Sequence, residues 1–273
     1  MIKSPMIGRM GGTTAFVAFT FFVAPQPAAL AQAPAQPAAS PQLGILAPAN
    51  LAKPRPKAPF DLTGTWLHNS PNGERFDPPA GFKLTPQAQM HYDAAQKATK
   101  EGKIYRNDIG LCWPAGLPIM MTRAWPVSMI QLPNSIFMIQ ELMNSVRIIY
   151  MDGRGHTDPE IAVPSFNGES IGRWEGDTLV IDTKHFVADH HWIHDRQGIP
   201  ASDALHIVER IRMIDGGTRL EIEYSLTDPK SWEGTWKITK FWRRVDDRDI
   251  AEVECLPDLN EHMPTVKSDA NVR

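Results

Sequence analysis

The sequence has almost no cysteine and almost no excess of charge. Its two cysteines, Cys112 and Cys255, are too few for an all-cysteine zinc site or a dense disulfide scaffold. Its 28 Lys and Arg residues stand against 31 Asp and Glu residues, for a formal net charge of −3. Because a polyphosphate backbone is bound by a strongly positive surface, this balance excludes a general nucleic-acid binder.

Several motifs and long apolar runs are also missing. The sequence has no Gly-x-Ser-x-Gly nucleophile elbow, phosphate-binding loop or dinucleotide fingerprint. The N-terminal apolar stretch from Thr14 to Ala24 is shorter than the roughly 20 residues that span a bilayer. An apolar content of 42% with 22% charged residues is typical of a globular chain with one domain or a small pair.

The N-terminus has the layout of a secretory signal peptide. Lys3 and Arg9 precede the apolar stretch, and small residues follow it at 29–33. We therefore predict a signal peptide over residues 1–33 and a periplasmic or secreted protein that has no membrane span after processing. Cleavage removes two cations and takes the net charge from −3 to −5.

The next segment, 34–59, is rich in alanine and proline, and proline favours an extended chain. We therefore expect a linker there and a single domain over 60–273.

One helix is predicted early in the domain. Thr85 is a suitable N-cap, Pro86 suits the first helical position, helix formers follow, and Gly102 ends the helix.

Most of the domain has the two-residue period of β-strands, separated by Gly and Asp turns. Strands are predicted at 136–140, 146–151, 178–183, 205–213, 219–226, 235–243 and 250–255. No helix long enough for a parallel crossover lies between them, so the sheet should be antiparallel. We expect a closed barrel of eight strands, which removes exposed edges and can hold a small ligand. A two-sheet β-sandwich is the alternative.

Histidine is the main indication of chemistry, because imidazole titrates nearest neutral pH and is the commonest metal ligand. Five of the nine histidines lie between His185 and His206. In the segment 189–195, His190 and His194 can share one face, with Asp189 or Asp195 as a further ligand or as a partner that orients an imidazole. A solvent-facing polar loop explains the same residues without chemistry.

Two further segments carry candidate residues. After the Asp-Gly turn at 152–153, Arg154 can stabilise an anion while His156 moves a proton, or both can have structural roles. Glu209 shares the apolar face of its strand, so it either pairs with an arginine such as Arg147 or acts as an interior acid or base.

In an exported protein, Cys112 and Cys255 are expected to pair with each other.

The segment from Asp61 to about Asn260 resembles an uncharacterised family of secreted bacterial proteins. The resemblance is carried by Asp152-Gly153-Arg154-x-His156, Gly172-Arg173-Trp174-Glu175-Gly176-Asp177-Thr178-Leu179-Val180, Glu209-Arg210, Thr227-Asp228-Pro229 and Glu254-Cys255. That family commonly has proline where this chain has Thr157. The resemblance transfers no activity.

Gly64-Thr65-Trp66 is similar to the Gly-x-Trp opening of lipocalin-like barrels. That likeness implies a calycin-like barrel whose tryptophan packs against a late arginine, here Arg243 or Arg244. Barrels of this kind include ligand carriers, hydratases, isomerases and lyases, which is an analogy of fold alone.

Three functions follow as hypotheses. The first is cofactor-free acid–base chemistry on a small apolar or aromatic molecule, of lyase, hydratase or isomerase type. Its residues would be His191 or His194 as base, His156 as acid, Arg154 for developing charge and Asp195 to orient a histidine, with Glu209 as an interior candidate. The second is non-catalytic binding of an apolar ligand in the periplasm. The third is a metal-dependent hydrolase or lyase, with zinc on two or three of His190, His191, His194 and His206. The oligomeric state stays open.

Overall fold

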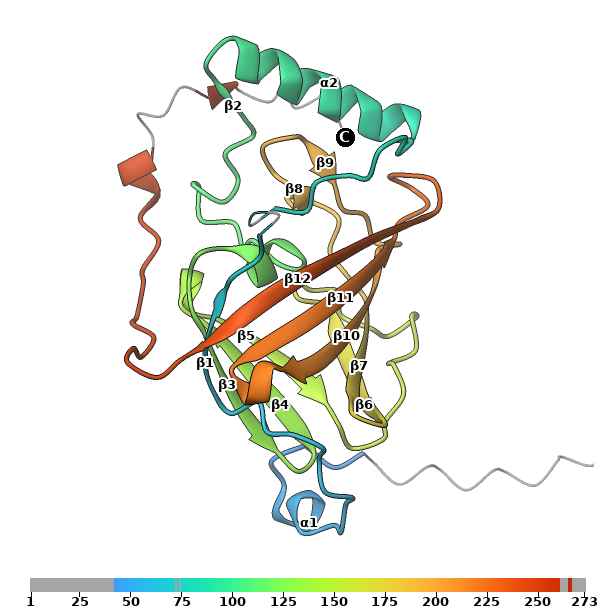
Figure 1. Ribbon diagram of the computed structural model, residues 1–273. Helices are drawn as coiled ribbons and strands as arrows, with labels where there is room; N and C mark the ends of the chain where they lie inside the picture. Colours follow the sequence, from blue (N-terminus) through green and yellow to red (C-terminus); the bar gives the residue numbers. More distant parts are fainter. Residues whose placement is uncertain (1–41, 72, 74, 261–264, 267–273) are drawn as a thin grey trace, which may run out of the picture. The chain divides into compact units, whose positions relative to one another are not determined.

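Alternating apolar and polar residues build a closed β-barrel in the computed structural model, which describes residues 42–71, 73, 75–260 and 265–266 (Figure 1). Among these residues nine strands close in the order β1, β12, β11, β10, β7, β6, β5, β4 and β3. They are β1 (Gly64–His68), β3 (Val127–Leu132), β4 (Ser135–Gln140), β5 (Ser145–Tyr150), β6 (Glu169–Glu175), β7 (Thr178–Lys184), β10 (His206–Ile214), β11 (Arg219–Thr227) and β12 (Thr235–Val245). The predicted lipocalin-like barrel is confirmed, and the sandwich alternative is not observed.

The barrel differs from the prediction in strand number and in one pairing. β5 and β6 are parallel, with Ile149 opposite Ser170 and Tyr150 opposite Ile171. Parallel neighbours need a long crossover, and residues 151–168 supply it as an irregular loop instead of a helix. We name this segment the crossover loop, and it carries both Arg154 and His156.

The remaining elements pack around the barrel. The predicted helix is confirmed as α2 (Pro86–Lys100), with the Thr85 side chain accepting a hydrogen bond from the Ala88 N–H. The short elements are α1 (Pro48–Leu51), the pair β2 (Ile104–Tyr105) and β13 (Thr265–Val266), the pair β8 (Trp192–His194) and β9 (Ile199–Pro200), and 3-10 turns at Ile119–Thr122, Leu142–Asn144, Asp215–Gly217 and Pro257–Asn260. The strand predicted at 250–255 is wrong, because this segment pairs with no strand. Within the described residues, no helix has the length and apolar character needed to cross a membrane.

Large aromatic side chains fill the barrel. Trp66, Trp236 and Trp242 are fully buried, and the Trp66 indole donates to the Leu62 carbonyl at 2.8 Å. The guanidinium of Arg244 lies 4.4 Å from the centre of the Trp66 ring. Of the two arginines predicted for this contact, Arg244 therefore makes it.

Part of the expected linker belongs to the same compact unit as the barrel, which begins at Leu43. Ile45 is buried and its carbonyl accepts a hydrogen bond from the Asn134 side chain, while buried Asn50 donates to Asp152 at 3.3 Å. We name residues 43–61 the strap. The prediction of a spacer over all of 34–59 is wrong for the strap, because its apolar and amide side chains find partners on the barrel. The predicted signal peptide lies outside the described residues.

Candidate functional site

A group of histidines and carboxylates lies on the outer face of the barrel, where β6, β7 and β10 are neighbours. We name it the His156 cluster; it consists of His156, Glu169, Asp182, His185 and His206. Glu169 opens β6, Asp182 lies in β7, His185 follows β7, and His206 opens β10. The side chains are between 14% and 34% exposed, so they are partly desolvated and still reachable from solvent.

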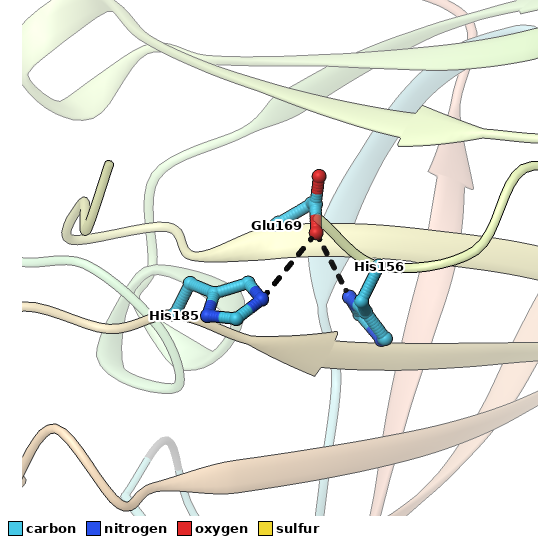
Figure 2. Close-up of side chains that lie close together, drawn as sticks. All are labelled: His156, Glu169 and His185. Carbon is cyan, nitrogen blue, oxygen red and sulfur yellow. Dashed lines mark hydrogen bonds and ion pairs between the residues drawn. The ribbon is translucent and has the colours of Figure 1, made fainter. Parts of the chain in front are cut away.

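Three members of the cluster converge on one point (Figure 2). The Nδ1 atom of His156 lies 3.1 Å from Oε2 of Glu169, and the Nε2 atom of His185 lies 3.7 Å from the same oxygen. All three atoms lie within 4.8 Å of one another. His185 Nε2 is buried and has no hydrogen-bond partner among the described residues. Its lone pair or proton is therefore directed at this shared point.

Thr157 fixes the Glu169 carboxylate in place. Its backbone N–H donates to Oε2 at 2.8 Å, and its hydroxyl donates to Oε1 at 2.6 Å. Burial alone would raise the pKa of Glu169, but these two hydrogen bonds and the neighbouring His156 bring that pKa below its usual value. Glu169 is therefore an ionised carboxylate of fixed orientation at neutral pH. A proline at position 157 would provide neither donor.

Asp182 joins the two remaining histidines. One carboxylate oxygen lies 2.8 Å from His156 Nε2 and the other lies 3.0 Å from His206 Nε2. Burial opposes ionisation, but the hydrogen bonds from His206 and His156 lower the pKa of Asp182 to about 2. A continuous hydrogen-bonded chain thus runs from Thr157 through Glu169, His156 and Asp182 to His206.

The local backbone explains why these side chains meet. A Cβ at Gly168 would lie 2.6 Å from the Lys184 carbonyl oxygen, so glycine allows the chain to enter β6 against the end of β7. His185 has a φ of +61°, an unfavourable conformation for a residue with a Cβ. The N–H of Ser165 holds it there by donating to the His185 carbonyl at 3.1 Å.

A pocket of about 610 Å³ opens beside the cluster. Glu169 and His185 line one side of it, and both apolar and polar residues of β5 and the crossover loop line the rest, among them Ile148, Ile161, Val163, Ser165 and Asn167. Of these, Ile161 and Val163 are 75% and 87% exposed, which is unusual for branched aliphatic side chains. The pocket can therefore hold a small, largely apolar molecule against the cluster.

The sequence matches no family model and no curated protein.

Arg154 lies near the cluster but is engaged elsewhere. Its guanidinium makes two hydrogen bonds to Asp152, at 2.8 and 2.6 Å, and lies 4.2 Å from the centre of the Tyr150 ring. The hydrogen bonds from Arg154 lower the pKa of Asp152 to about 2, against the effect of burial. Arg154 thus makes the pairing with a structural acid that the sequence allowed.

The histidines at 190–194 do not converge. His190 stacks on Trp113 and bonds Asp108, and the two ring nitrogens of His191 face the carbonyl oxygens of Val187 and Leu117, at 3.0 and 2.6 Å. His194 faces Asp77, while Asp195 pairs with Arg123 at 2.9 Å instead of orienting a histidine. Together with His206, these residues point to separate partners, so the zinc site expected from them does not form in the described part of the chain.

Glu209 lies inside the barrel, fully buried, and forms a two-armed ion pair with Arg147. Of the two possibilities that the sequence left open for Glu209, the structure shows the ion pair with Arg147. Among the six residues predicted as catalytic, only His156 belongs to the cluster, and the described side chains of the six make no hydrogen bonds with one another. Glu169, Asp182 and His185 were not predicted, because their convergence depends on strand pairing. The surplus of histidines was the one signal for it.

Burial of neutral histidines makes the barrel sensitive to mild acid. Burial and the nearby Lys240 lower the pKa of His68 from 6.5 to about 4, and burial also lowers the pKa values of His91, His191 and His194. As the pH falls below 6.5 the unfolded chain takes up protons that the folded chain does not, so stability is lost between about pH 6.5 and 4. His68 alone should contribute about 1–3 kcal/mol, allowing for solvent screening.

Urea unfolding at about pH 7 and pH 4.5 measures this effect. His68→Gln should remove part of the pH dependence, whereas carboxylates such as Asp152 act only at lower pH. Equal free energies of unfolding at the two pH values would contradict the prediction.

Proposed function

We propose that the protein is a metal-dependent enzyme that binds a divalent transition-metal ion, best matched by zinc, through His156, Glu169 and His185. Two imidazole nitrogens and one carboxylate oxygen are a ligand set that catalytic zinc sites use. The observation that carries the proposal is the approach of both imidazoles to one Glu169 oxygen, at 3.1 and 3.7 Å. Tetrahedral bonds of zinc to N and O ligands separate neighbouring donor atoms by about 3.4 Å, and the two distances lie on either side of that value.

The surroundings of the three ligands support the same proposal. A metal-bound histidine usually donates its other N–H to a carboxylate, which fixes the tautomer. His156 has this arrangement, since Nδ1 faces Glu169 while Nε2 lies 2.8 Å from Asp182. His206 holds the far oxygen of Asp182. These contacts of His156 and Asp182 support the proposal, because they resemble the carboxylate–histidine arrangement behind a metal ligand.

The chemistry of such a site is activation of water for hydrolysis or hydration. Three protein ligands leave a coordination position for water, whose pKa falls toward 7 on zinc. The adjoining pocket, with Ile161 and Val163 at its rim, favours a small, largely apolar substrate. A zinc ion held by His156, Glu169 and His185 would supply the activated water for hydrolysis or hydration of a molecule in this pocket.

The test is zinc binding by tag-free full-length protein, measured by calorimetry with zinc chloride and by elemental analysis. We expect one equivalent of zinc for the native chain. His185→Asn should weaken binding at least about 100-fold, and Asp182→Asn should weaken it about 10–100-fold without changing the stoichiometry. Less than about a tenth of an equivalent in the native chain would overturn the proposal.

The chain offers a matched control in His190. It has a φ of +57° against +61° for His185, and it also faces a carboxylate, Asp108. Asparagine tolerates this left-handed conformation, so His185→Asn and His190→Asn make the same change at two comparable positions. Only the first should lose zinc. Equal zinc binding by both variants would exclude His185 as a ligand.

Cofactor-free acid–base chemistry is the second candidate, and the hydrogen-bonded chain around His156 favours it. Glu169 and Asp182 on its two ring nitrogens could pass a proton along the chain. In that case activity should survive a strong chelator and still be lost in His156→Gln. The metal proposal requires the chelator to abolish activity and added zinc to restore it.

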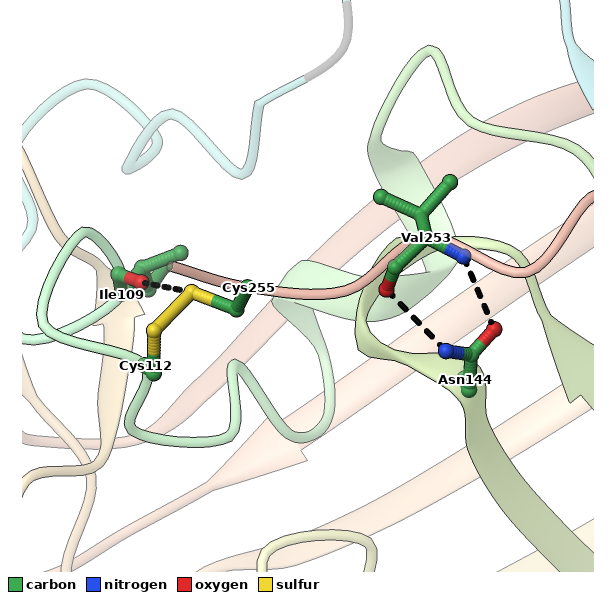
Figure 3. The surroundings of a disulfide bond; sticks show 5 residues. All are labelled: Ile109, Cys112, Asn144, Val253 and Cys255. Atoms are coloured by element: carbon green, nitrogen blue, oxygen red, sulfur yellow. Dashed lines mark hydrogen bonds between the residues drawn. A yellow bond between two sulfur atoms is a disulfide. The ribbon is translucent and has the colours of Figure 1, made fainter. Parts of the chain in front are cut away.

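We further propose that the protein acts outside the cytoplasm, where disulfides persist. Cys112 and Cys255 are bonded, with their Cα atoms 5.7 Å apart (Figure 3). This observation and the signal-like N-terminus support export.

A further inference from the structure

A second cavity lies at the strap end of the barrel, and its lining includes no residue of the His156 cluster. It measures about 1120 Å³ and is bounded by the strap, by the turn between β3 and β4, and by β6. We propose that it binds an anionic amphiphile: a carboxylate on an apolar chain. This proposal does not rest on the metal site.

The floor of the cavity is apolar and reaches the barrel core. Ile136, which is fully buried, and Met151 contribute to it. Phe60 of the strap meets Trp174 of β6 edge to face, with ring centres 4.8 Å apart. Gly172 makes room there, because a Cβ at this position would lie 2.3 Å from the Met151 sulfur. An alkyl chain or a flat ring can bury its surface against this floor.

The rim of the cavity is positive, although the whole chain has a net charge of −3. Four cationic residues line it against one acid; they are Lys53, Arg55, Lys57 and Arg173, with Asp61. Arg55 is bonded to Asn50 and Arg173 to Glu175, while no ion pair of Lys53 or Lys57 is found among the described residues. These two lysines are therefore available to a carboxylate, and because both are exposed the attraction should weaken as the salt concentration rises.

The strap is attached on both sides of the cavity and crosses it. It is fastened at one side by Asn50, bonded to Asp152, and at the other by the Phe60 carbonyl, which accepts from Gln131 at 3.0 Å. Between these points Pro54, Pro56 and Pro59 have no N–H to offer a strand. The strap thus spans the cavity without pairing with the sheet, and both lysines lie on this span. The apolar floor of the cavity therefore stays accessible beneath the strap, which carries Lys53 and Lys57.

Calorimetry with decanoate and with decanol tests the proposal, because the two probes share a chain and differ in charge. The native protein should bind decanoate at least about 10-fold more tightly than decanol. The double variant K53E/K57E should lose this preference and keep its affinity for decanol, as expected for an electrostatic contact. Both lysines are exposed, so the variant should fold normally.

The control is K97E/K100E, which makes the same charge change on exposed positions of α2, at the opposite end of the barrel from α1 (Figure 1). It should bind decanoate like the native protein, and so should His185→Asn. No decanoate binding, equal affinities for acid and alcohol, or unchanged binding in K53E/K57E would each overturn the proposal. If the native protein binds decanoate but binds no zinc, only the metal site is overturned.

Discussion

Glu209→Ala should lower the free energy of unfolding by about 3–5 kcal/mol, because it leaves the Arg147 guanidinium buried without its counter-charge. Arg147 is 1% exposed and Glu209 is fully buried. Besides both carboxylate oxygens, the guanidinium contacts the hydroxyls of Ser170 and Thr183, at 3.0 and 3.1 Å. Those neutral partners cannot replace a charge. Urea unfolding at neutral pH measures the loss.

Two variants distinguish the loss of the buried ion pair from the unspecific effect of substituting a glutamate in this sheet. Glu223→Ala removes an exposed glutamate from the neighbouring strand β11 and should change stability by less than about 0.5 kcal/mol. The double variant R147M/E209L replaces the pair with apolar side chains and should be more stable than Glu209→Ala, since neither charge is left alone. A loss below about 1 kcal/mol in Glu209→Ala would contradict a structural role. Loss of activity at full stability would return Glu209 to the catalytic candidates.

Removing the disulfide should cost about 5 kcal/mol, because the bridge joins residues separated by 143 positions and restricts most of the unfolded domain. For a chain of this size that corresponds to a fall of about 10–20 °C in Tm. The double variant C112S/C255S tests this by thermal unfolding. Reduction of the native protein is the matched control, since it opens the bridge without changing a side chain.

The disulfide also holds a segment that has few other contacts. Between β12 and Cys255, the Val253 backbone exchanges two hydrogen bonds with the Asn144 side chain, at 3.0 and 3.2 Å (Figure 3). Nearby, the Ala251 N–H donates to Glu141. Hydrogen exchange at Val253 should therefore become faster in the reduced protein than exchange in β11. Unchanged Tm and unchanged exchange after reduction would show that the bridge contributes nothing.

The sequence predicted the barrel because strand alternation and turn residues are local signals. β7, β10, β11 and β12 are close to their predicted ranges, and α2 begins at its predicted cap. The segment 250–255 also alternates, but its backbone finds no strand neighbour and is held by side chains and the disulfide. β6 was not predicted as a strand, and its parallel partner β5 is brought to it only by the crossover loop.

The candidate site also combines features that local sequence patterns predict with features that only the tertiary structure decides. The sequence by itself determined that histidines are abundant, that Cys112 and Cys255 are the two cysteines expected to pair in an exported protein, and that Glu209 lies on an apolar face, where it either pairs with an arginine or acts as an interior acid or base. Each of these follows from residue type and local pattern. Only the tertiary structure decided that His156 meets Glu169 and His185, while His191 and His194 turn to other partners. The reason is that strand register places residues distant in sequence on one face of the sheet, and no local pattern encodes that register.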